Sequence, residues 1–275
     1  KKKLSADLRI IFPGYSAVFS DITGITSINI LKSYQTPESI LKASKDDIIS
    51  LLGASFRKGM DWCKKTYNKL IKAAENAKTI GIHLPSFSIK ISGVISIIDS
   101  LNEQINILLA QIKAMVKGDE LPKNFKNNIK LLKSIPGVGF LTAVTLMAEI
   151  GDFNNFIKPK QLVAYFGLDP AVNESGKFKS DKEKMSKRGT RFGRRALYAV
   201  ALASVRTKRD GQATNKVLLD YYQDNLKGKK KKVALVAIMH KLVNYLFAVL
   251  REQKPYEQRA PKIHQQMYLR NKQAA

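Results

Sequence analysis

The residues best suited to chemistry lie in a basic stretch that follows a short polar loop. Nine basic and two acidic residues fall between Lys177 and Arg195, and the loop before them holds one serine, Ser175, beside Gly176. A helix is predicted to begin at Arg191, and the dipole of its first turns favours an anion. Nearly all the charged side chains at this position are positive, which predicts a phosphate clamp. The alternative is a charged face that only contacts solvent.

The helix that begins at Arg191 is predicted to have a basic face and a core face. On a helical wheel the basic face holds Arg191, Arg194, Arg195 and Tyr198. The opposite, core-facing stripe holds Phe192, Ala196, Ala199 and Ala203. The residues expected to contact DNA or RNA in this region are Lys177, Lys187, Arg188, Arg191, Arg194 and Arg195.

A second phosphate-binding signal lies upstream, in the turn Pro136-Gly137-Val138-Gly139. An apolar helix leads into this turn, and a second apolar helix continues from it to Ile150. The two glycines allow close approach to the backbone, and the amides at the start of the second helix bind phosphate. The pattern predicts a helix-hairpin-helix, which grips the DNA backbone without reading bases. The alternative is a tight interhelical turn that never meets DNA.

The charge of the chain indicates a polyanionic partner. The 275 residues include 48 Lys+Arg and 22 Asp+Glu, a net charge of +26, and 44% are hydrophobic, enough for a core. Residues 1–120 carry 17 basic and 11 acidic side chains, and residues 121–275 carry 31 and 11. Phosphates release counterions when Lys and Arg replace them, so nucleic acid is expected to dock on the C-terminal half.

The composition also excludes several classes of protein. The longest apolar stretches, 135–150 and 233–250, are interrupted by charged or polar residues, so no membrane partner is expected. One cysteine forms no intrachain disulfide, and three histidines with one cysteine do not build a usual zinc site. No signal peptide is recognisable. We expect a cytoplasmic protein associated with the nucleoid.

The periodicity predicts a mainly α fold. Four segments are expected: an N-terminal helical segment (1–86), a coiled-coil dimerisation helix (87–120), a C-terminal helical domain with the hairpin (121–256) and a tail (257–275). Within the first segment, Thr36 and Ser44 are predicted N-caps, since acidic residues follow each of them in the first helical turn.

Apolar residues recur every seven positions between residues 91 and 116. Ile at one core position and mostly Leu at the other favours a two-stranded coiled coil. We therefore expect a homodimer or higher oligomer, with contacts from Ile91, Ile98, Leu101, Ile105, Leu108 and Ile112. The alternative is a helix packed on its own domain, because apolar residues at 95, 97 and 109 widen the stripe.

The order of motifs resembles that of one known family. The hairpin is followed by Leu162-Val163-Ala164-Tyr165-Phe166-Gly167-Leu168-Asp169-Pro170, then Glu174-Ser175-Gly176-Lys177, then Met185-Ser186-Lys187-Arg188-Gly189 and the arginine-led helix. This order, over residues 130–207, is similar to the C-terminal transposase domain of the insertion-sequence one-ten family, also called the Piv/MooV-like or DEDD recombinases. The predicted coiled coil also fits this family.

The resemblance implies a site-specific DNA transposase or recombinase that is guided by a structured RNA. A serine of the family's C-terminal domain attacks the DNA phosphate, and it carries over to Ser175, with Ser186 as the second candidate. An N-terminal RNase-H-like domain supplies four acidic residues that hold Mg²⁺.

This chain departs from the family pattern in its acidic residues. None of Asp46, Asp47, Glu149, Asp152, Asp169 and Asp181 follows the strand-borne spacing of an RNase-H-like site, so no metal ligand is assigned. Mg²⁺ is expected only through the missing domain. We therefore expect a truncated transposase, inactive alone, that supplies the serine and the dimer contacts. The alternative is a non-catalytic DNA-binding, assembly or inhibitory protein that uses the hairpin and the basic clamp.

Overall fold

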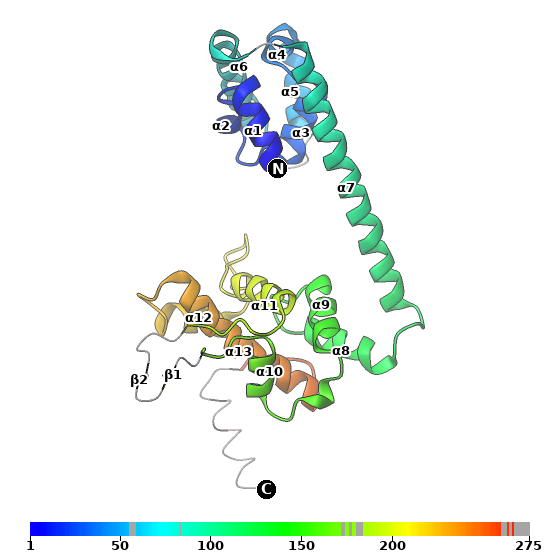
Figure 1. Cartoon of the computed structure of the whole chain (residues 1–275), viewed down its shortest axis with the longest axis vertical. Coiled ribbons are helices and arrows are strands. Elements are labelled where there is room, and N and C mark those ends of the chain that lie inside the picture. Colours follow the sequence, from blue (N-terminus) through cyan, green and yellow to red (C-terminus); the bar gives the residue numbers. More distant parts are fainter. Residues whose placement is uncertain are drawn as a thin grey trace. The chain divides into compact units, whose positions relative to one another are not determined.

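The computed structural model describes residues 1–54, 59–82, 84–171, 184–259, 263 and 266, together with the backbone of residues 174–175 and 178–179. The described residues are mainly α-helical, which confirms the predicted fold class. The chain divides into two compact units, Lys1–Lys113 and Ala114–Ala275 (Figure 1). Each unit has a hydrophobic core of its own.

Unit 1 consists of short helices packed against longer ones. Its elements are α1 (Lys2–Ile11), α2 (Tyr15–Val18), α3 (Ile25–Ser33), α4 (Pro37–Lys42), α5 (Lys45–Gly53), α6 (Met60–Ile80) and most of α7 (Pro85–Lys117). Both predicted N-caps are confirmed, since the Thr36 side chain accepts a hydrogen bond from Ser39 N and the Ser44 side chain accepts one from Asp47 N. These caps satisfy amides that have no partner inside the helix.

The heptad pattern of α7 is buried in the first part of the helix and exposed further along. Its first apolar residues pack inside unit 1, where Ile91 has no exposed surface and Ile98 is half-buried. Ile91 is therefore a core residue of its own unit, and its prediction as a dimer contact is wrong. Further along the helix the same register is open to solvent, at Leu101 (58% exposed), Ile105 (52%) and Leu108 (56%).

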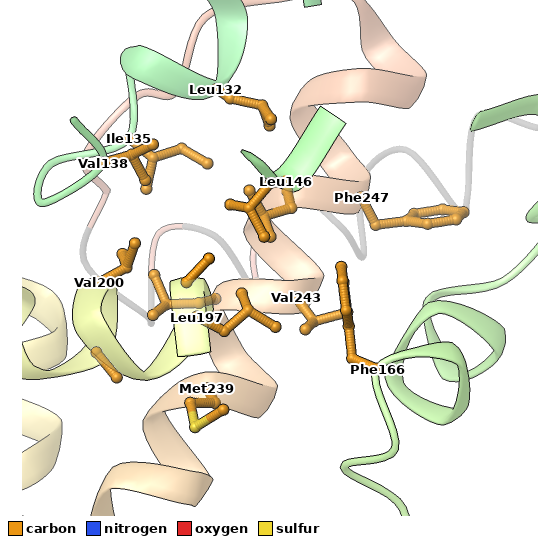
Figure 2. Packing of buried hydrophobic residues seen from close by; sticks show 14 of the residues in the cluster. Leu132, Ile135, Val138, Leu146, Phe166, Leu197, Val200, Met239, Val243 and Phe247 are labelled. Carbon is orange, nitrogen blue, oxygen red and sulfur yellow. The ribbon is translucent and has the colours of Figure 1, made fainter. Parts of the chain in front are cut away.

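Unit 2 is organised around the long helix α13 (Lys231–Glu252). Its other elements are α8 (Lys123–Lys133), α9 (Phe140–Ile150), a 3-10 turn (Phe153–Asn155), α10 (Pro159–Tyr165), β1 (Glu174–Ser175), β2 (Phe178–Lys179), α11 (Arg191–Ser204) and α12 (Lys216–Asp224). Helices α8, α10, α11 and α12 all contact α13. Side chains from different helices meet in this core, among them Leu146 of α9, Leu197 of α11 and Val243 of α13 (Figure 2).

By length and composition α13 could span a membrane, and its apolar side chains are used in the core of unit 2. Its buried residues are Ala234, Leu235, Ile238, Met239, Leu242, Val243, Leu246, Phe247, Val249 and Leu250. The position of α13 between several helices therefore accounts for its apolar composition.

Candidate nucleic-acid interface

The predicted hairpin turn lies between α8 and α9, which pack on each other. Gly137 has a left-handed φ of 99°, and Val138 N donates a hydrogen bond to the Ile135 carbonyl oxygen at 3.0 Å. Gly139 is the N-cap of α9, and as a glycine it has no side chain that could cap this helix. The first amides of α9 therefore have no partner within the helix or from the N-cap side chain, which is the arrangement that binds phosphate at a helix N-terminus.

The two glycines of this turn differ in their surroundings. A Cβ atom at Gly137 would lie 2.7 Å from Ser204 Oγ, and the positive φ disfavours any L side chain. Gly137 thus lets the turn pack on the end of α11, where Ser204 Oγ donates to the Pro136 carbonyl oxygen at 3.2 Å. A Cβ atom at Gly139 would meet nothing within 4 Å, and this residue is exposed. Gly139 therefore leaves open space in front of the first turn of α9.

The segment that follows α13 packs against the start of the turn. Tyr256 N donates to Ser134 Oγ at 2.7 Å, and the rings of Tyr245 and Tyr256 lie 5.1 Å apart. Burial, with a smaller contribution from Tyr256, raises the pKa of the Tyr245 hydroxyl, and burial also raises the pKa of Tyr256. Both phenols therefore stay neutral at physiological pH and support the turn through packing.

Helix α11 exposes two of its three predicted arginines, half-buries Arg194, and buries a different stripe from the one predicted. The exposed residues in its first half include Arg191, Arg195 and Tyr198. The buried stripe is Gly193, Ala196, Leu197, Val200, Ala201 and Ser204, whereas Phe192 is 56% exposed. The predicted core face through Phe192 and Ala199 is therefore wrong. A Cβ atom at Gly193 would lie 2.5 Å from the Phe166 ring, so this glycine allows the observed stripe to pack.

Hydrogen bonds to neighbouring elements hold the start of α11. Thr190 is the N-cap of this helix, and its hydroxyl donates to Glu149 Oε2 of α9. Arg194 Nη1 donates to the carbonyl oxygens of Phe166 (3.1 Å) and Gly189 (2.7 Å). Arg194 thereby ties α11 to the loop before it, and this nitrogen is committed to the backbone.

Ser175 lies in a two-stranded antiparallel ribbon. Strand β1 pairs with β2, and Ser175 stands opposite Phe178. Gly176 and Lys177, the second of which is predicted to contact nucleic acid, lie outside the described residues, as do residues 180–183. The backbone of Ser175 thus belongs to a short strand, whereas the sequence predicted a polar loop at this position.

Ser186, the second candidate serine, is held by Asp169. Its Oγ donates to Asp169 Oδ1 at 2.6 Å, and its backbone N donates to Asp169 O at 2.8 Å. Both residues are half-buried. Ser186 therefore fastens the segment before α11 to the segment after α10. No local sequence pattern predicts this pairing, because the two residues are 17 positions apart.

Lys187 and Arg188 continue from Ser186 at the surface. Lys187 has a left-handed φ of 56°, which is uncommon for a residue other than glycine. Its backbone N donates to the Gly167 carbonyl oxygen at 3.1 Å, and this bond accompanies the unusual conformation. Both side chains are exposed, so their charges face solvent.

Apart from Ser175 and Lys177, the residues predicted to attack or bind phosphate form two groups at the two ends of α11. We call them the turn site (Pro136–Gly139), which packs at Ser204, and the loop site (Ser186–Arg195), which includes the start of α11. The 14 residues of α11 separate them by about 20 Å along the helix axis. Each site offers chemical groups that bind phosphate: backbone amides at the turn site and exposed cations at the loop site.

Known proteins share the segment that holds these two sites. A family described as the IS116/IS110/IS902 transposases matches residues 129–217. The chain is 25% identical over 232 residues to an insertion element IS110 uncharacterized 43.6 kDa protein of Streptomyces coelicolor. It is 34% identical over 131 residues to a pilin gene-inverting protein of Moraxella bovis, and 31% identical over 158 residues to a transposase for insertion sequence element IS1111A of Coxiella burnetii.

These alignments cover only part of each protein. The alignment with the Streptomyces coelicolor protein includes 84% of this chain and 53% of the relative. The alignment with the Moraxella bovis protein includes 47% and 38%, and that with the Coxiella burnetii transposase includes 56% and 40%. The chain thus spans about half, or less, of the length of the relatives it matches.

Proposed function

Because residues 129–217 match the transposase domain of the IS116/IS110/IS902 family, we propose that this chain acts in DNA transposition or site-specific recombination. In this proposal the turn site grips the DNA backbone, and Ser175, which precedes the loop site in the sequence, attacks a DNA phosphate. One observation carries it: the family match covers the segment that holds both phosphate-binding groups at the ends of α11. The resemblance adds a structured guide RNA as a further partner.

The proposed chemical step is a transesterification. A bond forms between Ser175 Oγ and phosphorus while a phosphorus–oxygen bond of the DNA strand breaks. The hydroxyl proton passes to a base, and the departing DNA oxygen takes up a proton. Negative charge grows on the phosphate during this step, and nearby cations stabilise it. The exposed cations available for this role are Lys187, Arg188, Arg191 and Arg195.

The described residues do not fit an Mg²⁺ site. No three or more His, Cys, Asp or Glu side chains among them are placed to hold a metal ion together. We therefore assign no step to the metal. In this proposal Mg²⁺ reaches the reaction only through an RNase-H-like acidic domain, as the family resemblance implies.

The DNA grip can be tested with Gly139→Val. Valine fits the extended backbone of this residue (φ −83°, ψ 168°), and its Cβ would meet nothing within 4 Å. The new side chain would stand before the first amides of α9 and keep a phosphate away. We expect the affinity for duplex DNA to fall about tenfold or more, which corresponds to about 1.4 kcal/mol or more. Fluorescence anisotropy at fixed salt measures the change.

Gly59→Val is a matched control for this experiment. Gly59 is the N-cap of α6 in unit 1, has similar dihedral angles (φ −69°, ψ 161°) and also has open space around its Cβ position. It should leave DNA affinity unchanged. An equal loss of affinity in both variants would overturn the role of the turn site. A wild-type affinity that does not change with salt would contradict phosphate binding altogether.

We also propose that the exposed part of α7 joins two copies of this chain. Leu101, Ile105 and Leu108 continue the heptad register, and Ile112 is half-buried one heptad beyond Ile105. Two such helices can pack through these positions. Ile105→Glu with Leu108→Glu should lower the oligomeric mass and leave each copy folded, because neither side chain is in the core of unit 1.

Light scattering measures the mass of the double variant and compares it with the mass of an Ile107→Glu control. Ile107 is 43% exposed and lies between the two seam residues in sequence but outside the heptad register. It should keep the wild-type mass. A double variant with unchanged mass would show that α7 is not the dimer contact.

A further inference from the structure

A short β-hairpin follows α11 and belongs to neither the turn site nor the loop site. Thr207 and Ala213 form an antiparallel bridge, and Lys208 N donates to the Gln212 carbonyl oxygen at 2.7 Å. The tip turns at Asp210 and Gly211, where Gly211 has a φ of 80° and Asp210 Oδ1 accepts from Gln212 N at 2.9 Å. The residues from 206 to 214 therefore have a defined conformation, and we call them the basic hairpin. In Figure 1 it projects as a yellow loop beside α11.

The basic hairpin carries three exposed positive side chains. Arg206, Lys208 and Arg209 are exposed, and within the described part of the chain no ion pair involves them. The one acid, Asp210, uses an oxygen to close the turn. Three unpaired cations on a closed turn are a surface for an anionic partner.

The position of the hairpin links it to the turn site. It begins two residues after Ser204, and Ser204 Oγ donates to the Pro136 carbonyl oxygen. Gly137 lies against the same serine, since a Cβ there would reach within 2.7 Å of Ser204 Oγ. The hairpin and the uncapped start of α9 are therefore held at the same end of α11 by direct contacts.

We propose that the basic hairpin is a second DNA-backbone contact, which binds duplex phosphates beside the phosphate held at the turn site. This inference rests on the proposed function, because it places the same duplex against both elements. The composition of the hairpin indicates a duplex rather than a single strand: residues 206–214 include no aromatic side chain on which an unpaired base could stack. They offer only charge and hydrogen bonds, which are the groups that contact phosphates.

The test replaces Arg206, Lys208 and Arg209 together by Ala in the full chain. Asp210 and Gly211 remain, so the turn can still close. The plot of log K against log salt concentration for duplex DNA should become shallower by about 2.7, because each phosphate contact contributes about 0.9. The matched control replaces Lys64, Lys65 and Lys69, three exposed lysines of α6 in unit 1, and removes the same charge. Its slope should equal that of the wild type.

The outcomes distinguish this inference from the proposal beneath it. If the wild type binds duplex DNA and the hairpin variant has the slope of the control variant, the hairpin is not a contact. If affinity for a single strand of the same length falls more than affinity for the duplex, the duplex assignment is wrong. If the wild type binds no DNA, the proposed function itself fails, and this inference fails with it. Equal melting temperatures of all three proteins show that the differences come from binding.

Discussion

With Ser175 replaced by Ala, we expect no covalent protein–DNA adduct and unchanged DNA binding. The experiment uses this chain joined to an RNase-H-like acidic domain and a DNA substrate labelled at the cleaved strand. Alanine removes the oxygen that would bond to phosphorus but keeps the turn site and the exposed arginines. Loss of a nucleophile in a catalytic group lowers the rate by about 10⁴-fold or more. Denaturing gels that retain only covalent complexes measure the adduct.

Ser186→Ala is the control for the serine assignment. The Ser186 hydroxyl donates to Asp169 at 2.6 Å, so its removal should cost about 1 kcal/mol of folding stability. We expect the adduct to form in this variant, and Asp169→Asn to have a similar effect on the melting temperature. If the Ser175 variant still forms the adduct, Ser175 is not the nucleophile. If a folded Ser186 variant loses the adduct, Ser186 is the better candidate.

A third outcome concerns the wild-type protein. If it binds DNA with the expected salt dependence but forms no adduct even with the acidic domain present, the non-catalytic alternative is supported. The loop site and the turn site would then serve assembly or inhibition. The binding assays of the turn site keep their meaning in that case, because they do not depend on cleavage.

Gly189→Ala should strongly destabilise unit 2, although it adds only one methyl group. A Cβ at Gly189 would lie 1.9 Å from the Tyr165 carbonyl oxygen and 2.5 Å from Gly167 N. These are backbone atoms, so the clash cannot be relieved by turning a side chain. We expect a loss of about 3 kcal/mol or more of unfolding free energy, since overpacking costs about 1–3 kcal/mol even where side chains can adjust. Urea unfolding followed by circular dichroism measures it.

The same substitution should also reduce function through the loop site. Gly189 O accepts a hydrogen bond from Arg194, and the next residue, Thr190, caps α11. When the loop is pushed from Tyr165, the start of α11 loses both supports and its exposed arginines lose their position. Gly139→Ala is the matched control for stability alone, because its new methyl group would meet open space. A Gly189 variant as stable as this control would contradict the close backbone packing.

Signals within a few residues of each other were enough to predict two helix starts and part of the charged surface. Thr36 and Ser44 are caps because each side chain reaches an amide three residues ahead. Arg191 and Arg195 are exposed, as the helical wheel of α11 predicted. The basic hairpin also had a local signal, the Asp210-Gly211 turn between basic residues, but no motif drew attention to it.

Tertiary packing decided which of several equivalent patterns is used. In α11 the predicted stripe runs through Phe192, whereas the observed stripe runs through Gly193, where the Phe166 ring occupies the space of a Cβ atom. In α7 one continuous heptad register is divided, because unit 1 covers Ile91 and leaves Leu101 exposed. Periodicity reports that a stripe exists but does not report what covers it.

The sequence by itself determined the helical fold class, the phosphate-binding residue types and the family resemblance. These depend on composition and on contacts between residues a few positions apart. Only the tertiary structure joined Ser186 to Asp169 and Thr190 to Glu149, pairs that lie 17 and 41 residues apart. It also set the turn site and the basic hairpin at one end of α11. Contacts of this kind form when separate helices pack on a shared core, so they depend on the whole unit and not on any local pattern.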